Sequence, residues 1–500
     1  MSADVKTSEE SRGVRLARWA FAVLVPMALA AAVTAVTLRW FGDRVLGGGV
    51  PGVCRELLAG STQGRQALYG SCWRGPLFPL FHLPFAWLLP SGWAIIGSTF
   101  TAWLFLFLSV RQCLKRYARG WHPLFLAPQI ALAVIALAMR SPALAAVQVP
   151  LTAGFYLLAA AGLAEWAETR EVRSVVATGV AAAFLLLCGA VCFIPAALFL
   201  LSIPLLACGD SASRRRIQAW VLLGWLPALY AFGVWMLMNR LVLGDALFFL
   251  RSIPGMAAGQ RTGLWLLLSV PFLWLPAYLT TWIQEGNPSR RGSWMAVLLV
   301  AGVAVAALAI LFAALGWRWP RESLFFCAYA VLLAAISRGP KKAFNYSVIY
   351  GMMLLAVIAG AGFFASKATA ALDDPRKGET SPEELCAAIE RYVTEKSPYA
   401  RVFVMGYDGL ELLRSYSGER LTPNMDLHLF SLRQAYKGQH LFVLMPKPEG
   451  VTRTESLFWR YPDIYAKGID RLLVDRDFGD WRLYECVVAP TREQLDAWRK

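Results

Sequence analysis

Acidic and arginine residues in two polar stretches are the groups in this sequence that could do chemistry. The stretches are residues 39–78 and 239–263, and each lies between strongly hydrophobic segments. Their main candidates are the acids Asp43, Glu56 and Asp245 and the arginines Arg74, Arg240, Arg251 and Arg261. A carboxylate can accept the proton of an attacking hydroxyl group, and a guanidinium group binds phosphate oxygens through paired hydrogen bonds. These residue types predict a carboxylate base beside a phosphate-binding site.

Each candidate also has a purely structural interpretation. Asp43 can be a turn residue in Phe-Gly-Asp, and Glu56 can lie on the solvated face of a short amphipathic helix in VCRELLAG. Asp245 can be the N-cap of a helix DALFFLRS, where aspartate is favoured. Arginines near the membrane surface can lay their stems along lipid and keep their charge in water. The sequence leaves both interpretations open.

Other catalytic and metal-binding motifs are absent from the sequence. It contains no H-E-x-x-H, Walker A, G-x-S-x-G or C-x-x-C pattern. No cofactor is certain, although a carboxylate such as Asp43 could act with or without a divalent metal ion. Two cysteine pairs could form disulfides in an oxidising compartment, namely Cys54 with Cys72 and Cys386 with Cys486.

The elements that carry the candidates are expected to be membrane helices. Hydrophobic residues make up 57% of the chain, charged residues 16%, and the mean hydropathy is +0.48. Soluble proteins average about 25% charged residues, and this composition also excludes disordered and collagen-like chains. About eleven stretches approach the roughly 20 apolar residues that a membrane helix needs. They are 19–38, 79–109, 123–139, 143–163, 174–189, 191–207, 218–238, 264–282, 294–315, 323–337 and 345–366.

The distribution of charge predicts the orientation. Residues 367–500 hold 20 basic and 21 acidic residues, so the net charge of +16 comes from the hydrophobic part and does not indicate a nucleic-acid partner. With the N-terminus in the cytoplasm, all four lysines of residues 1–366 fall inside. We expect a cytoplasmic segment 1–18, a transmembrane domain 19–366 with outer loops 39–78 and 239–263, and an extracytoplasmic domain 367–500.

The tail pattern predicts a small α/β domain. Ser381 and Glu384 form a capping box for a helix over 382–396. Further helices are expected at 408–416, 425–436 and 456–468, and strands at 401–406, 440–448, 471–479 and 481–488. Asp477-Phe478-Gly479 fits a hairpin turn between the last two strands.

Three segments resemble the type C glycosyltransferase superfamily, and more narrowly the bacterial relatives of the protein mannosyltransferases and the lipid A aminoarabinose transferase. They are CRELLAG with WRGPLFPLFHLPFAWLL, then NRLVLGDALFFLRS, and finally RYPDIYAKGIDRLLVDRDFGDWRLYEC. The resemblance covers nearly the whole chain. It implies a multi-pass protein of the bacterial cytoplasmic membrane that transfers a sugar from a polyprenyl-phosphate donor to an envelope lipid, glycan or protein.

The resemblance also implies roles for the candidates. Asp43 would be the catalytic base or bind a metal ion, and Arg74, Arg240, Arg251 and Arg261 would hold the donor phosphate. Glu56 and Asp245 would be further substrate contacts. Relatives usually carry an acid shortly before the segment that matches CRELLAG, whereas residues 45–49 here read VLGGG.

Two other functions follow from these observations. Without the usual acid, the chain could be a catalytically silent relative that binds a lipid-linked saccharide, or a scaffold that docks envelope-assembly proteins on its tail. A transporter or lipid flippase is disfavoured, because charged residues inside the predicted spans are nearly absent.

Overall fold

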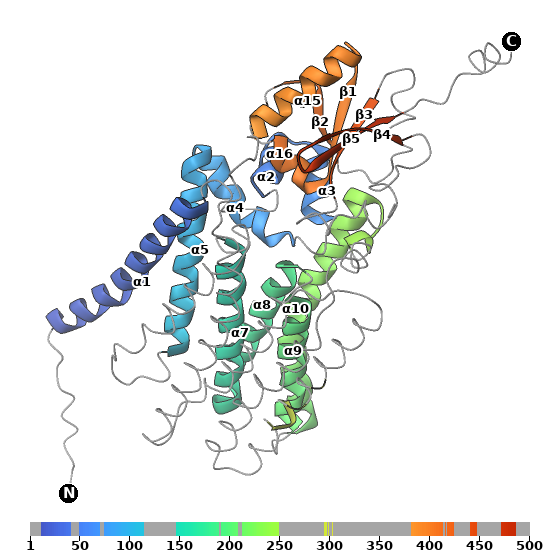
Figure 1. Cartoon of the computed structure of the whole chain (residues 1–500). Helices are drawn as coiled ribbons and strands as arrows, with labels where there is room; N and C mark the ends of the chain where they lie inside the picture. Colours follow the sequence, from blue (N-terminus) through green and yellow to red (C-terminus); the bar gives the residue numbers. More distant parts are fainter. Residues whose placement is uncertain are drawn as a thin grey trace, which may run out of the picture.

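A computed structural model gives the arrangement of the chain (Figure 1). It describes residues 12–41, 50–70, 75–114, 147–189, 192–208, 213–249, 295–297, 299, 303, 382–413, 416, 418–424, 441–447 and 472–486. These residues form a bundle of apolar helices with a small α/β domain at one end of it. We call this end of the bundle the domain end, and the other the opposite end.

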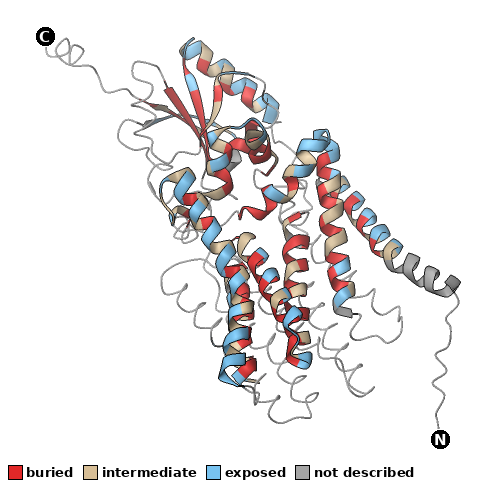
Figure 2. Cartoon of the chain, turned by 180° about the vertical axis from the view of Figure 1, so that it is seen from behind, coloured by how far each residue is buried: buried red, intermediate tan, exposed pale blue. Residues whose placement is uncertain are grey.

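Long apolar helices make up the bundle. They are α1 (Arg12–Phe41), α5 (Ser91–Leu114), α7 (Val149–Thr169), α8 (Val172–Leu187), α9 (Phe193–Cys208) and α10 (Arg214–Leu243). Helix α8 lies at the centre and contacts α7, α9 and α10. Aromatic and small side chains fill the interior, with Trp103, Tyr156 and Trp166 almost completely buried. In Figure 2, buried residues are red and lie mainly on the inner helices of the bundle, whereas pale-blue exposed residues lie along its outer sides.

Two of the described helices are long and apolar enough to cross a membrane, namely residues Ser91–Gln112 and Arg214–Leu243. Shorter apolar helices occupy the predicted spans near residues 19–38, 174–189 and 191–207. Helix α7 covers most of the predicted span 143–163. The predicted spans 123–139, 264–282, 323–337 and 345–366 lie outside the described residues, as does nearly all of 294–315.

The overlong stretch 79–109 is divided into two helices. Helix α4 (Leu77–Leu88) ends where Leu89 adopts an extended conformation, and α5 begins just after Pro90. A proline disfavours the helical conformation of the residue before it, which explains the break. The 12 residues of α4 extend only about 18 Å, less than a bilayer's hydrocarbon core of about 30 Å. The stretch 79–109, predicted as one span, is therefore a short helix followed by the long helix α5.

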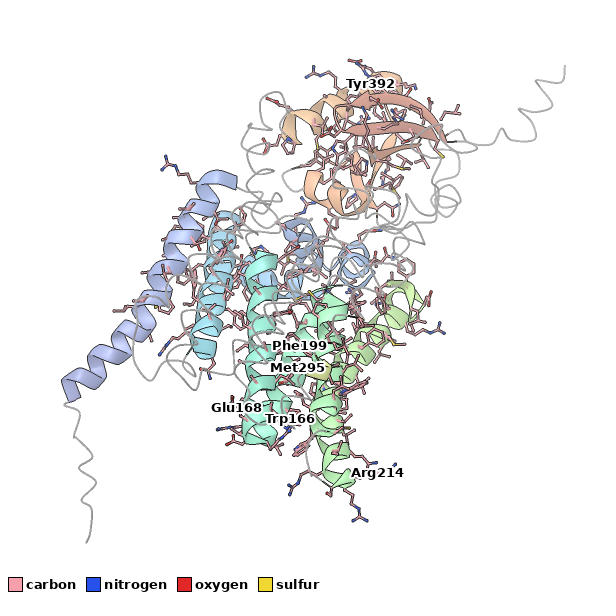
Figure 3. All side chains as sticks on the ribbon, turned by 60° about the horizontal axis from the view of Figure 1, so that its bottom comes forward. Trp166, Glu168, Phe199, Arg214, Met295 and Tyr392 are labelled. Atoms are coloured by element: carbon pink, nitrogen blue, oxygen red, sulfur yellow. The ribbon has the colours of Figure 1, made fainter. Side chains whose placement is uncertain are left out.

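The opposite end is held together by two tryptophans and an arginine. Arg170 ends α7 in the left-handed conformation, with a φ of 56°. Its guanidinium carbon lies 4.6 Å from the ring centroid of Trp166 and 5.5 Å from that of Trp220, and it donates a hydrogen bond to the Leu206 carbonyl. Parts of α7, α9 and α10 therefore meet around one cation. Figure 3 shows Trp166 and Arg214 at this end, far from Tyr392 in the α/β domain.

The α/β domain contains a five-stranded sheet of order β2-β1-β3-β5-β4. Its elements are α15 (Pro382–Lys396), β1 (Arg401–Met405), α16 (Gly406–Leu412), β2 (Leu421–Asn424), β3 (Leu441–Pro446), β4 (Leu472–Phe478) and β5 (Trp481–Cys486). Strands β1, β2 and β3 are parallel, whereas β5 and β4 are antiparallel to their neighbours. Figure 2 shows β1 and β3 as mostly buried.

The domain confirms the predicted helix 382–396, the four predicted strands and the turn at Gly479. Strand β2 was not predicted from the sequence. The helix expected at 408–416 begins two residues earlier and ends at Leu412. The helices expected at 425–436 and 456–468, and the Ser381 side of the capping box, lie outside the described residues.

The expected disulfide between Cys386 and Cys486 is not formed. Both cysteines are buried and neither is in a disulfide. The Cys386 thiol instead faces α16 and donates to the Leu412 carbonyl at 3.8 Å. Cys54 is also free, and its thiol donates to the Pro79 carbonyl at 3.4 Å. Burial raises the pKa of Cys54 to about 12, so this thiol stays protonated. Cys72 lies outside the described residues.

Candidate functional site at the domain end

A helical hairpin at the domain end lies between Asp43 and Arg74 in the sequence of the first outer loop. It consists of α2 (Val50–Leu58) and α3 (Thr62–Tyr69), and we call it the loop hairpin. Ser61 caps α3 by accepting a hydrogen bond from the Gly64 amide at 3.1 Å. Asp43 precedes this hairpin in the chain and Arg74 follows it. The position of the hairpin therefore bears on where both candidates can act.

Helix α10 binds the end of the loop hairpin through two side chains. Trp235 Nε1 and Asn239 Nδ2 each donate a hydrogen bond of 3.1 Å to the Tyr69 carbonyl. Both side chains are buried, and Asn239 also donates to the Trp235 carbonyl at 3.0 Å. Two donors on one carbonyl fix the end of α3 against the last turns of α10. The segment before Arg74 is thus tied to the helix that carries Arg240.

The chain after α10 folds back onto the same region. Phe249 stacks on Trp235 with ring centroids 4.5 Å apart and an interplanar angle of 18°. On the far side of Arg74, Gly75 lies so close to the end of α8 that a Cβ there would overlap the Leu187 carbonyl oxygen. The described residues on both sides of Arg74 are therefore held by α8 and α10.

Arg240 and Asp245 both make local contacts. Arg240 donates to the Gly244 carbonyl just past the end of its own helix. The Asp245 side chain accepts a hydrogen bond of 3.1 Å from the Leu247 amide, which is a turn contact two residues along the chain. The end of the predicted helix DALFFLRS lies outside the described residues, so the N-cap role of Asp245 stays a prediction. The Arg240 side chain is exposed and a cation at a helix C-terminus is favourable. Phosphate binding by Arg240 would require this local contact to be exchanged for a ligand.

The solvated position expected for Glu56 is wrong. Its side chain is 14% exposed and pairs with Arg55 Nη2 at 3.2 Å, whereas the apolar Leu58 is 45% exposed. The reason is that Glu56 lies against α3, because a Cβ at Gly64 would be only 2.9 Å from the Glu56 Cβ. Glu56 therefore forms an ion pair within the loop hairpin, and its proposed role as a substrate contact is not tested by this arrangement.

Asp43, Arg74, Arg251 and Arg261 lie outside the described residues. The described residues that flank Asp43 are Phe41 at the end of α1 and Val50 at the start of α2, and both are at the domain end (Figure 1). In the described part of the chain, no group of three or more His, Cys, Asp or Glu residues could hold a metal ion. A divalent ion at Asp43 stays a prediction.

Three buried polar residues near this end were missed by sequence reasoning. Asn239 and Trp235 bind the loop hairpin as described above. His82 is 2% exposed, and its Nδ1 lies 3.0 Å from Ser98 Oγ. Because Ser98 donates to the Ile95 carbonyl at 3.1 Å, its oxygen accepts from His82, which joins α4 to α5. The signal for His82 would have been a polar residue in the otherwise apolar helix α4. Nothing local in α10 distinguishes Trp235 from its other tryptophans or Asn239 from the polar residue beside it.

No protein-family model matches this sequence, and no curated protein is significantly similar to it. Two solved structures are similar to the fold. One is ArnT from Cupriavidus metallidurans bound to undecaprenyl phosphate, with 14% identity, coverage of 93% of this chain and 99% of that chain, and a TM-score of 0.45. The other is the arabinofuranosyltransferase AftD from Mycobacteria, with 16% identity and a TM-score of 0.47.

The match to AftD covers 95% of this chain and 42% of that chain, so this chain spans less than half the length of AftD. Because neither TM-score reaches 0.5, the function proposed below rests on the residues of this chain.

Proposed function

We propose that this chain is an integral membrane glycosyltransferase that moves a sugar from a polyprenyl-phosphate donor to an envelope acceptor. The observation that carries the proposal is the loop hairpin between the α/β domain and the bundle. It ties the loop that carries Asp43 and Arg74 to the end of α10, where Arg240 and Asp245 lie. This contact supports a site to which two distant parts of the sequence would contribute a base and phosphate-binding groups.

The orientation we propose places the domain end outside the bacterial cytoplasmic membrane. The exposed residues Arg214, Arg215 and Arg216 begin α10 at the opposite end. Arginine and lysine are enriched in cytoplasmic loops, which favours the cytoplasm for that end. The N-terminus would then be inside and the α/β domain outside, where lipid-linked donors and envelope lipid, glycan or protein acceptors meet.

The proposed reaction is an inverting displacement at the anomeric carbon. The Asp43 carboxylate takes the proton of the acceptor hydroxyl while the hydroxyl oxygen forms a bond to the anomeric carbon. The bond from that carbon to the phosphate oxygen breaks, and polyprenyl phosphate leaves with the bonding electrons. Arg74, Arg240, Arg251 and Arg261 would bind the phosphate, whose negative charge increases as the bond breaks.

The test is donor binding and turnover by the purified chain in nanodiscs. Undecaprenyl- and decaprenyl-phosphate sugars are offered with a panel of acceptors, and Asp43→Asn is compared with the wild type. We expect donor-dependent transfer that is lost in Asp43→Asn while donor binding persists. The exposed Arg65→Gln in α3 is the matched loop control and should keep the wild-type rate. Absence of donor binding would contradict the proposal at its first step.

A second candidate function is supported by residues 45–49, which hold no acid. A catalytically silent relative would bind the lipid-linked saccharide, or scaffold envelope assembly through its α/β domain, without transferring a sugar. The wild type and Asp43→Asn would then bind donor equally well, and Asp43→Asn would keep the cellular role of the protein. Binding without turnover across the whole panel would favour this function over the transferase.

A further inference from the structure

The α/β domain contacts the loop hairpin through helix α16. Val53 and Ala67 from the hairpin and Leu410 from α16 form a separate buried cluster, and each is at most 1% exposed. A Cβ at Gly52 would lie 2.5 Å from the Leu410 carbonyl oxygen, so the backbones of α2 and α16 are in direct contact. The sequence positions in this contact are far apart, as the separation of 358 residues between Arg55 and Leu413 shows.

Arg55 adds a directed interaction to this apolar contact. Its Nη1 donates a hydrogen bond of 2.5 Å to the Leu413 carbonyl, immediately after the last residue of α16. Its Nη2 pairs with Glu56, which holds the guanidinium group from the other side. The Leu413 carbonyl also accepts a hydrogen bond of 3.1 Å from the Tyr416 amide, so Arg55 is its second donor. Carbonyls at the end of a helix carry partial negative charge, which makes a cation favourable there. Arg55 thus caps a helix of the other domain.

The loop hairpin is held from both sides. On the bundle side, Cys54 donates to the Pro79 carbonyl of α4, and Trp235 and Asn239 hold Tyr69. On the other side, Arg55 and Gly52 meet α16. Contacts on two faces fix the position of the loop hairpin. If only the bundle held it, the hairpin could tilt about its contacts with α4 and α10.

We propose that Arg55 is a positioning residue that couples the α/β domain to the first outer loop. By holding α2 against α16, it sets the position from which the chain leads back to Asp43 and forward to Arg74. The α/β domain then contributes to the reaction by fixing this loop, without supplying a reacting group. The catalytic part of this inference rests on the proposed function.

The test compares Arg55→Gln and Arg55→Lys with the wild type in full-length protein in nanodiscs. Arg65→Gln is the control, since Arg65 lies exposed on α3 of the same hairpin. Turnover of the undecaprenyl-phosphate sugar, binding of undecaprenyl phosphate and amide hydrogen exchange in residues 42–74 and 406–413 are measured for each. Gly52→Ala serves as a second variant, because it separates the same two backbones without removing a charge, with Gly92→Ala as its open-space control.

For Arg55→Gln, we expect kcat to fall about tenfold to a hundredfold, because a misplacement of about 1 Å can have that effect. The KM for the donor should change little, and exchange should become faster in α2 and α16. Arg55→Lys should recover most of kcat, since an ammonium group can still donate to the Leu413 carbonyl. Gly52→Ala should show the same faster exchange and the same loss of kcat.

Two results would overturn the inference. One is wild-type kcat and wild-type exchange in both Arg55→Gln and Gly52→Ala. The other is a loss of kcat that Arg55→Lys does not restore, with exchange unchanged in α2 and α16. No turnover by the wild type, together with faster exchange in Arg55→Gln, would instead overturn the proposed function and support Arg55 as the residue that positions the loop.

Discussion

The two ends of the helix bundle are joined in different ways. At the domain end, side chains donate to single backbone carbonyls, as Trp235 and Asn239 do to Tyr69, and glycines let backbones meet. At the opposite end, the rings of Trp166 and Trp220 pack around Arg170, whose guanidinium group donates one hydrogen bond to the Leu206 carbonyl. Hydrogen bonds to the backbone depend on distance and angle, whereas ring contacts tolerate sliding. The domain end adds two donors on one carbonyl and close backbone contacts at glycines, and this fixed backbone is what the proposed site would need.

The largest expected effect tests the close backbone contact at the domain end. Gly75→Val would place a branched side chain against the Leu187 carbonyl, which is backbone and cannot rotate away. We expect loss of more than about 3 kcal/mol of stability, as overpacking at a rigid contact can cause. Thermal unfolding of the purified protein measures it. Gly92→Val, which meets nothing within 4 Å, is the control, and equal losses in both would contradict the contact.

A change at the opposite end should affect stability without affecting the site. Arg170→Ala removes the hydrogen bond to Leu206 and the contacts with both tryptophan rings. We expect a loss of about 1–3 kcal/mol, in the range of charged hydrogen bonds. Undecaprenyl phosphate binding should stay at the wild-type level. The control is Arg173→Ala, because the Arg173 side chain is 76% exposed. If Arg170→Ala weakened the binding of undecaprenyl phosphate and Arg173→Ala did not, the opposite end would also contribute to the site, contrary to this comparison.

Asn239→Leu tests a single directed contact at the domain end. The change removes one of the two donors to the Tyr69 carbonyl and leaves Trp235 in place. A net hydrogen bond contributes about 0.5–1.5 kcal/mol, so the melting temperature should fall only slightly. We expect a larger relative effect on turnover than on stability. A fall in stability with unchanged turnover would show that the fixed end of α3 does not matter for the site.

The smallest effect concerns the α/β domain at low pH. Hydrogen bonds from Arg482, together with Lys447, lower the pKa of Asp477 to about 2. A carboxyl group with a lowered pKa stabilises the folded state above its unfolded pKa of about 3.9, and this contribution is lost as the pH falls towards 2.

Asp477→Asn should therefore destabilise the hairpin of β4 and β5 at pH 6 by no more than about 1 kcal/mol, because the side chains are partly exposed. The difference from the wild type should shrink as the pH falls from 4 towards 2. Amide hydrogen exchange in residues 472–486 of the full chain measures the destabilisation at pH 6 and its decrease at lower pH. A difference that grows on acidification would contradict the assigned charge of Asp477.

Local sequence determined several features by itself. The helix Pro382–Lys396 lies where the capping-box pattern predicted it, the break between α4 and α5 follows from Pro90, and the turn contact at Asp245 follows from its side chain. Each depends on residues within one or two turns, whose sterics and hydrogen bonds act over short distances. Strands β3 and β5 likewise lie within the predicted strands 440–448 and 481–488.

Only the tertiary structure decided the features that depend on distant partners. Strand β2 has the sequence LTPN and becomes a strand because it pairs with β1. Glu56 is more buried than Leu58 because it lies against Gly64 of α3. Cys386 forms no disulfide, and its thiol donates to the Leu412 carbonyl of α16. No local pattern around Arg55 indicates the carbonyl that it caps. The sequence supplies the charge, and the fold supplies its partner from the other end of the chain.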